Sequence, residues 1–170
     1  MNKAITILII VLIVGGIGVL LVLYSNRNSV PQEKQATSSK TERKVEGYQG
    51  NVLAGNTAYY IEYNRADYEK AVSDGRVIFL DFYANWCPLC RTQAPEINAV
   101  FDNLESDKIV GFRVNYNDSE TDQDEKEFAK ALAITYQDTK IILKDGRAIF
   151  RTSEFVTEEQ LLAEINKALE

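Results

Sequence analysis

The sequence contains no histidine in its 170 residues. Catalysis by an imidazole acid or base and metal sites ligated by histidine are therefore excluded. Basic side chains are also fewer than acidic ones: the chain has 19 Lys+Arg and 25 Asp+Glu, which gives a net charge of −6. A nucleic-acid-binding domain needs a basic stripe on its surface, so this balance argues against that class of protein.

Cysteine is scarce, because the chain has only Cys87 and Cys90. Two cysteines cannot build the disulfide framework of a small secreted domain, and they cannot supply four zinc ligands from one chain. The pair is therefore either a local redox couple or incidental.

One long apolar run occupies residues 4–23, and Lys3 is the only charged side chain before Arg27. As a helix, a run of this length spans roughly 30 Å, about the thickness of a bilayer core. A cleaved signal peptide is the alternative, but the run is longer than a usual signal core and no A-x-A-like site follows it. We predict a membrane anchor over residues 1–24.

Residues 25–56 are rich in Ser, Gln, Lys, Glu and Asn, which predicts a flexible linker. Positive charges follow the apolar run at Arg27, Lys34, Lys40, Arg43 and Lys44. A simple count would place this flank in the cytoplasm. The charges are spread over a flexible stretch, however, and large domains translocate largely regardless of charge. We expect the following domain to lie outside the cytoplasm.

Residues 57–170 carry the periodic pattern of an α/β domain. The apolar run 77–83 is typical of a central strand covered on both faces. Asp145-Gly146 predicts a two-residue hairpin, and Thr157 with Gln160 forms a capping box. The expected strands are 59–63, 77–83, 109–114, 140–144 and 148–152, and the expected helices are 65–72, 87–104, 122–132 and 158–169. This order predicts a mixed central sheet with a parallel core, covered by helices.

Cys87-Pro88-Leu89-Cys90 lies where a buried strand gives way to a helix. Residues three apart on the first helical turn share one face, which brings both cysteines within reach of a disulfide. The helix N-terminus stabilises a thiolate at Cys87, Pro88 suits the first helical position, and Arg91 adds positive charge nearby. A C-x-x-C pair in this context indicates redox chemistry.

Residues 80–95, LDFYANWCPLCRTQAP, resemble the active-site strand, motif and helix of thioredoxins, and the resemblance extends over residues 57–170. It implies a thioredoxin-like fold in which Cys87 is the attacking nucleophile and Cys90 the resolving thiol. By the same resemblance, Asp81 is the buried carboxylate that exchanges a proton with the resolving cysteine. Trp86 and Pro88 are expected to contact the substrate.

Several of these residues have a simpler interpretation. Asp81 could be a solvated strand end, although a carboxylate within an apolar strand is costly unless it is functional or paired. Trp86 could be ordinary packing, and Pro95 kinks the helix on either view. Arg113 lies where thioredoxins often have a lysine, and we interpret it as a surface or strand-edge cation. The acidic residues 118–127 are expected to form a solvated loop and a helix start.

The sequence departs from thioredoxins at Asp138. Thioredoxins have a cis-proline here, which faces the cysteine pair and helps to bind the substrate backbone, whereas the three prolines of this chain are residues 31, 88 and 95. A cis bond before a non-proline residue is costly, so a trans bond is expected. Asp138 is predicted as a substrate contact whose negative charge raises the pKa of Cys87.

Together these features predict a membrane-tethered thiol–disulfide oxidoreductase that needs no cofactor. Its expected partners are protein disulfides or dithiols, a redox-recycling partner, and a lipid bilayer contacted through residues 4–23. The alternatives are a non-catalytic thioredoxin-like binding module, a static disulfide, and two chains that share a zinc ion through their C-x-x-C pairs.

Overall fold

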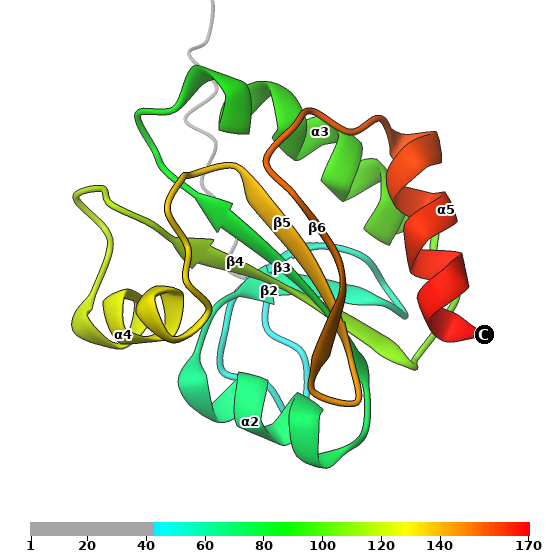
Figure 1. Ribbon diagram of the computed structural model, residues 1–170. Helices are drawn as coiled ribbons and strands as arrows, with labels where there is room; N and C mark the ends of the chain where they lie inside the picture. The colour runs from blue at the N-terminus through cyan, green and yellow to red at the C-terminus, as the bar shows by residue number, and fades with distance from the viewer. Residues whose placement is uncertain (1–42) are drawn as a thin grey trace, which may run out of the picture. The chain divides into compact units, whose positions relative to one another are not determined.

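The computed structural model describes residues 43–170 (Figure 1). The predicted membrane anchor, residues 1–24, and most of the predicted linker lie outside the described residues. Within residues 43–170, no helix combines the length and hydrophobicity that a bilayer span requires.

One six-stranded mixed sheet organises the domain, in the order β1-β2-β4-β3-β5-β6. The strands are β1 (Val52–Ala54), β2 (Tyr59–Glu62), β3 (Val77–Tyr83), β4 (Ile109–Asn115), β5 (Thr139–Lys144) and β6 (Arg147–Thr152). Strands β2, β4 and β3 are parallel, whereas β1 and the β5–β6 hairpin run antiparallel to their neighbours. The predicted mixed sheet is confirmed, and β3 lies inside it, as its apolar run requires.

Helices cover both faces of this sheet (Figure 1). They are α2 (Arg65–Ser73), α3 (Pro88–Asn103), α4 (Gln123–Ala131) and α5 (Glu158–Leu169). Successive side chains of β3 point to opposite faces of the sheet. Phe79 packs in the core under α3 and α5, and Leu80 packs in the core under α2 and α4. Asp81 therefore belongs to the same face as Phe79, on the side of α3.

Local signals in the sequence account for the element boundaries. The Asn64 side chain caps α2 by accepting hydrogen bonds from the N–H groups of Ala66 and Asp67. Thr157 and Gln160 form the predicted capping box of α5. Asp145 and Gly146 both have positive φ angles, 52° and 72°, as a two-residue type I′ hairpin requires.

The described end of the predicted linker is instead part of the domain. Strand β1 pairs antiparallel with β2, and the side chains of Val52 and Ala54 are buried in the core. The Asp67 carboxylate accepts hydrogen bonds from the N–H of Gln49 at 2.8 Å and of Gly50 at 2.7 Å. The linker boundary predicted at residue 56 is therefore wrong. Strand β1 has only three residues and follows a polar stretch, so the sequence carried too weak a signal to indicate it.

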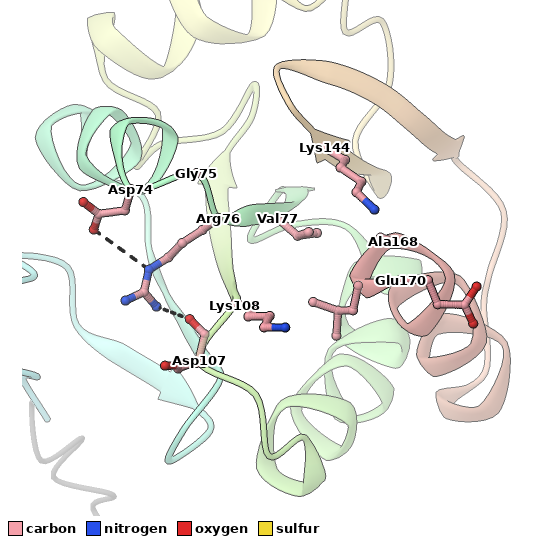
Figure 2. A pocket seen from close by; sticks show the side chains of 10 residues that line it. Asp74, Gly75, Arg76, Val77, Asp107, Lys108, Lys144, Ala168 and Glu170 are labelled. Atoms are coloured by element: carbon pink, nitrogen blue, oxygen red, sulfur yellow. Dashed lines mark hydrogen bonds and ion pairs between the residues drawn. The ribbon is translucent and has the colours of Figure 1, made fainter.

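A pocket of about 620 Å³ lies at the start of β3, around Val77 (Figure 2). Arg76, which lines it, already donates to the carbonyl oxygen of Asp107 at 2.6 Å. The cysteine pair follows the other end of β3, so this pocket is not part of the site described next.

Candidate functional site

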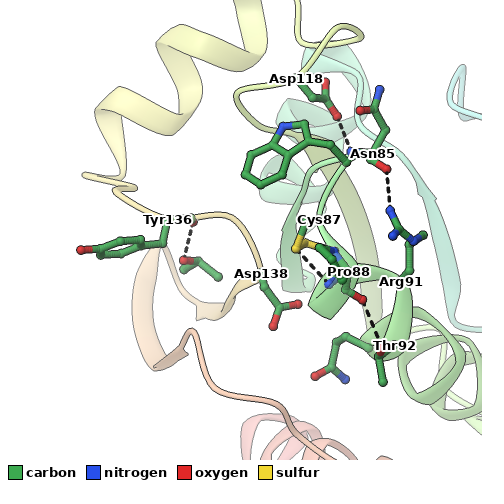
Figure 3. Close-up of a disulfide and its surroundings, with 12 residues drawn as sticks. Asn85, Cys87, Pro88, Arg91, Thr92, Asp118, Tyr136 and Asp138 are labelled. Atoms are coloured by element: carbon green, nitrogen blue, oxygen red, sulfur yellow. Dashed lines mark hydrogen bonds between the residues drawn. A yellow bond between two sulfur atoms is a disulfide. The ribbon is translucent and has the colours of Figure 1, made fainter.

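Cys87 and Cys90 form a disulfide at the N-terminus of α3, with their Cα atoms 5.3 Å apart (Figure 3). Cys87 is the N-cap residue, and its sulfur accepts a hydrogen bond from the N–H of Cys90 at 3.1 Å. Pro88 occupies the first turn, where its missing N–H leaves no helical bond unmade. The sequence predicted this arrangement, which directs the positive end of the helix dipole at Cys87.

Asp81 is buried near the end of β3, with only 3% of its surface exposed. Tyr60 donates a 2.7 Å hydrogen bond to its Oδ2 atom, and Oδ1 has no hydrogen-bond partner within residues 43–170. Burial raises the pKa of Asp81 to about 6, although the Tyr60 hydroxyl and the Lys140 ammonium act in the opposite direction. The interpretation of Asp81 as a solvated strand end is therefore wrong. A carboxyl with this pKa can take up and release a proton near neutral pH.

Lys140 is a buried cation that sequence analysis missed. It lies on β5 directly opposite Asp81 of β3 and has no exposed surface. Its Nζ atom is 2.9 Å from Oδ2 of Asp138 and donates to Oε1 of Gln93 at 3.3 Å. One signal was available, because Lys140 is two residues before Ile142 and so falls on the buried face of an apolar strand.

Asp138 lies on the loop before β5, beside the disulfide (Figure 3). No cis peptide bond occurs within residues 43–170, so the bond before Asp138 is trans, as predicted. Burial raises the pKa of the Asp138 carboxyl, while the bonded ammonium of Lys140 lowers it. The side chain is only 2% exposed, which leaves little surface for the predicted substrate contact. Its predicted influence on the Cys87 pKa stays a prediction.

The loop after β4 positions the residues that precede the disulfide. Asp118 accepts a 2.7 Å hydrogen bond from the N–H of Asn85, and the Asn85 amide donates to Ser119 at 2.9 Å. The Trp86 indole N–H donates to the carbonyl oxygen of Asn117 at 3.0 Å. Burial opposes ionisation of Asp118, but hydrogen bonds from Asn85, Thr121 and Glu120 outweigh it and lower the pKa of the carboxyl. The expected loop and helix start over residues 118–127 are confirmed, since α4 begins at Gln123 with an acidic first turn. Asp118 is only partly exposed, however, and bonds a residue 33 positions away.

Three large side chains near the disulfide are exposed to solvent. Trp86 is 50% exposed, Leu89 43% and Tyr136 67%. Pro88 is exposed as well. Trp86 and Pro88 thus lie where a partner can reach them, and their contact with substrate stays a prediction. Tyr136 was not singled out in the sequence. Exposed aromatic and aliphatic side chains around a buried reactive group are typical of a protein-binding surface.

Arg113 lies on β4 in register with Asp81, but its hydrogen bond goes elsewhere. The guanidinium donates to Glu62 at 3.0 Å and lies over the Tyr83 ring, 5.1 Å from the centroid. The interpretation of Arg113 as a surface or strand-edge cation is only partly right, because it is partly buried on β4, an interior strand of the sheet. Its ion pair with Glu62 indicates a structural role. Pro95 lies inside α3, as expected.

Comparison with known proteins agrees with this geometry. The family model described as "Thioredoxin" matches residues 59–167. Thioredoxin 2 of Plasmodium berghei is 32% identical over 110 residues, which cover 64% of this chain and 66% of that protein. The chain thus spans slightly less than two thirds of the length of this relative.

Solved structures show the same fold. The crystal structure of Trxlp from Edwardsiella tarda is 25% identical with a TM-score of 0.52, and the match covers 61% of this chain and 95% of the other. A chain in the crystal structure of a complex between ferredoxin:thioredoxin reductase and thioredoxin f2 is also 25% identical, with a TM-score of 0.51. That match covers 65% of this chain and 96% of the other.

Proposed function

Because the chain belongs to the thioredoxin family, we propose that it is a membrane-tethered oxidoreductase that exchanges disulfides with partner proteins through Cys87 and Cys90. The observation that carries this proposal is the disulfide at the N-terminus of α3, which follows the strand that contains buried Asp81. In the proposed site, the helix N-terminus stabilises the Cys87 thiolate and Asp81 accepts the proton of Cys90.

The first step starts from the reduced dithiol. The Cys87 thiolate attacks one sulfur of a partner disulfide, the partner S–S bond breaks, and a mixed disulfide forms. The other partner sulfur leaves as a thiolate and takes a proton. Cys87 is suited to this attack because the N–H of Cys90 points at its sulfur and the helix dipole favours negative charge there.

The second step releases the partner. Cys90 gives its thiol proton to the Asp81 carboxylate, and the new thiolate attacks the sulfur of Cys87. The Cys87–Cys90 bond forms, and the partner leaves as a second thiolate that is then protonated. The partner disulfide has been reduced and the dithiol of this protein oxidised. Oxidation of a partner dithiol uses the same residues in reverse.

Recycling requires another molecule, because the chain has only two cysteines. A protein reductase or a small thiol fits this role. The likeness to a chain in the reductase–thioredoxin f2 complex supports the choice of a protein. The exposed side chains of Trp86, Leu89 and Tyr136 supply a surface on which substrate and recycling partner would dock.

Membrane attachment is supported by the apolar run of residues 4–23. We place the domain outside the cytoplasm. A single exposed cysteine, introduced as Glu154→Cys in a Cys87→Ser, Cys90→Ser background, tests this topology with a membrane-impermeant maleimide. Labelling of intact cells is the expected result. Labelling only after permeabilisation would reverse the assignment.

Insulin reduction by dithiothreitol tests the activity, with Cys87→Ser as the matched control. We expect the wild type to accelerate the reaction and Cys87→Ser not to do so. Equal rates would favour the alternative, a non-catalytic binding module, for which the burial of Cys87 and the aspartate at position 138 are the supporting observations. Cys90→Ser, which cannot resolve the mixed disulfide, would capture the partner in cells.

A further inference from the structure

Two carboxyl groups and one ammonium group lie buried on the α3 side of the sheet, those of Asp81, Asp138 and Lys140. Two carboxyl groups thus share one ammonium group in a region with little access to water. A buried charge is costly unless it is paired, so this set ties one carboxylate to the ammonium and leaves the other carboxyl more readily protonated than a solvated one.

The ammonium of Lys140 is held in place from two directions. Oδ2 of Asp138 lies 2.9 Å from Nζ, and Oε1 of Gln93 accepts from Nζ at 3.3 Å. Gln93 is itself fixed, because its side chain accepts from the N–H of Val156 at 2.9 Å and donates to the Val156 carbonyl at 2.8 Å. Since Gln93 lies on α3 three residues after Cys90, these contacts connect Lys140 to the helix that carries the disulfide.

Lys140 is also the nearest strand neighbour of Asp81 on β5. The two residues are directly opposite in the antiparallel β3–β5 register, an arrangement that brings Cβ atoms to about 4.5–5.5 Å. The other groups that act on Asp81 are Tyr60 from β2, Arg113 from β4 and Asp138 from the loop before β5. Arg113 has the weakest influence of these, and its guanidinium is bound to Glu62.

We propose that Lys140, held between Asp138 and Gln93, is a positioning residue that controls when Asp81 accepts the proton of the resolving thiol. This inference rests on the proposed function. Asp138 forms the ion pair with Lys140, so Asp81 has no ion-pair partner of its own within residues 43–170. In the resolving step the S–H bond of Cys90 breaks and its proton moves to Asp81. The ammonium of Lys140 stabilises Asp81 in its ionised form before that transfer.

Two nearly isosteric substitutions separate this role from a structural one. Lys140→Met removes the cation, and the midpoint of Asp81 titration should rise by about one pH unit. Asp138→Asn removes the competing carboxylate and frees the cation, so the midpoint should fall by about the same amount. In the double variant Lys140→Met, Asp138→Asn, the midpoint of Asp81 titration should be near that of the wild type. The same holds for Lys140→Arg, which keeps the charge.

The measurement is the ¹³C carboxyl chemical shift of Asp81 against pH in the oxidised protein, assigned with Asp81→Asn. Shifts in the same direction in both single variants, or no shift in either, would overturn the inference. If Lys140→Met does not fold, Asp138→Asn decides alone, because an unchanged or higher midpoint contradicts the proposal.

The pH profile of the resolving step links this titration to the reaction. In single-turnover release of a peptide from Cys87, the profile should shift in the same direction as the Asp81 midpoint in each variant. The carboxyl titration needs no turnover, so the two proposals fail separately. A protein that titrates as expected but reduces no disulfide contradicts the proposed function. An active protein whose Asp81 midpoint does not move contradicts only the role of Lys140.

Discussion

The backbone N–H of Asp138 donates a 2.6 Å hydrogen bond to the carbonyl oxygen of Phe82, on the strand that leads to the cysteine pair. Asp138 adopts a positive φ of 61° in making it. Aspartate tolerates this left-handed conformation better than most residues. A proline has no N–H to donate and a φ fixed near −65°, so this loop is built for a residue other than proline.

Asp138→Pro, which introduces the residue found in thioredoxins, should therefore destabilise the protein. The matched control is Asp138→Asn, because both variants lose the carboxylate but only asparagine keeps the N–H and tolerates positive φ. We expect Asp138→Pro to be less stable than Asp138→Asn by about 3 kcal/mol in urea denaturation of the oxidised protein. Equal stability of the two variants would show that the loop accepts the proline backbone.

Asp81→Asn should change the pH dependence of stability in a defined direction. The pKa of Asp81 is about 6 in the folded protein against a reference value of 3.8, so folding favours the protonated carboxyl. Ionised Asp81 therefore lowers stability. This cost is absent below about pH 4, grows between pH 4 and 6, and is complete above about pH 6.

We expect the free energy of unfolding of Asp81→Asn to exceed that of the wild type by up to about 3 kcal/mol at pH 7.5 and to match it near pH 3.5. Urea denaturation of both proteins across this pH range measures the difference, in which most other titrating groups cancel. A difference that stays constant with pH would contradict the raised pKa of Asp81.

The secondary structure could be predicted from the sequence because its signals are local. The apolar run of β3, the capping box at Thr157 and the Asp145-Gly146 turn each lie within a few adjacent residues. The same holds for the cysteine pair, whose geometry depends on one helical turn. Strand β1 was missed because its three residues become a strand only by pairing with β2.

The buried charges could not be predicted in the same way. Lys140 is linked to Gln93, 47 residues earlier in the chain, and Tyr60 to Asp81, 21 residues later. Such partners are set by the packing of α3 on the sheet and by the position of β2 within it, which no short pattern encodes. The resemblance to thioredoxins indicated Asp81, but it said nothing of Lys140.

Asp118→Ala should loosen the segment that precedes Cys87. The Asp118 carboxylate accepts the N–H of Asn85, and its lowered pKa means that it stabilises the fold in its ionised form. We expect a loss of about 1–2 kcal/mol at pH 7. The loss should shrink as the pH falls through the folded-state pKa of Asp118, because the wild type then loses the same interaction.

Urea denaturation followed by the fluorescence of Trp86, the single tryptophan, measures both stability and the local environment. Glu120→Ala is the matched control, because Glu120 is an exposed acidic residue of the same loop. An equal effect of the two substitutions would show that loop charge matters rather than the hydrogen bond to Asn85.

Trp86→Ala should weaken reaction with protein disulfides far more than reaction with small ones. The indole is half exposed next to the disulfide and is held by its hydrogen bond to the Asn117 carbonyl oxygen. An exposed, fixed aromatic side chain offers contact area to a partner at little conformational cost. We expect kcat/KM for insulin to fall about tenfold, and the rate with oxidised glutathione to change by no more than about twofold.

Ile149→Ala is the control, because Ile149 is equally exposed but lies on β6 near the Asp145-Gly146 turn. It should leave both rates unchanged. Equal losses with both substrates in Trp86→Ala would mean that the indole tunes Cys87 itself, because a docking surface cannot affect a disulfide too small to touch it.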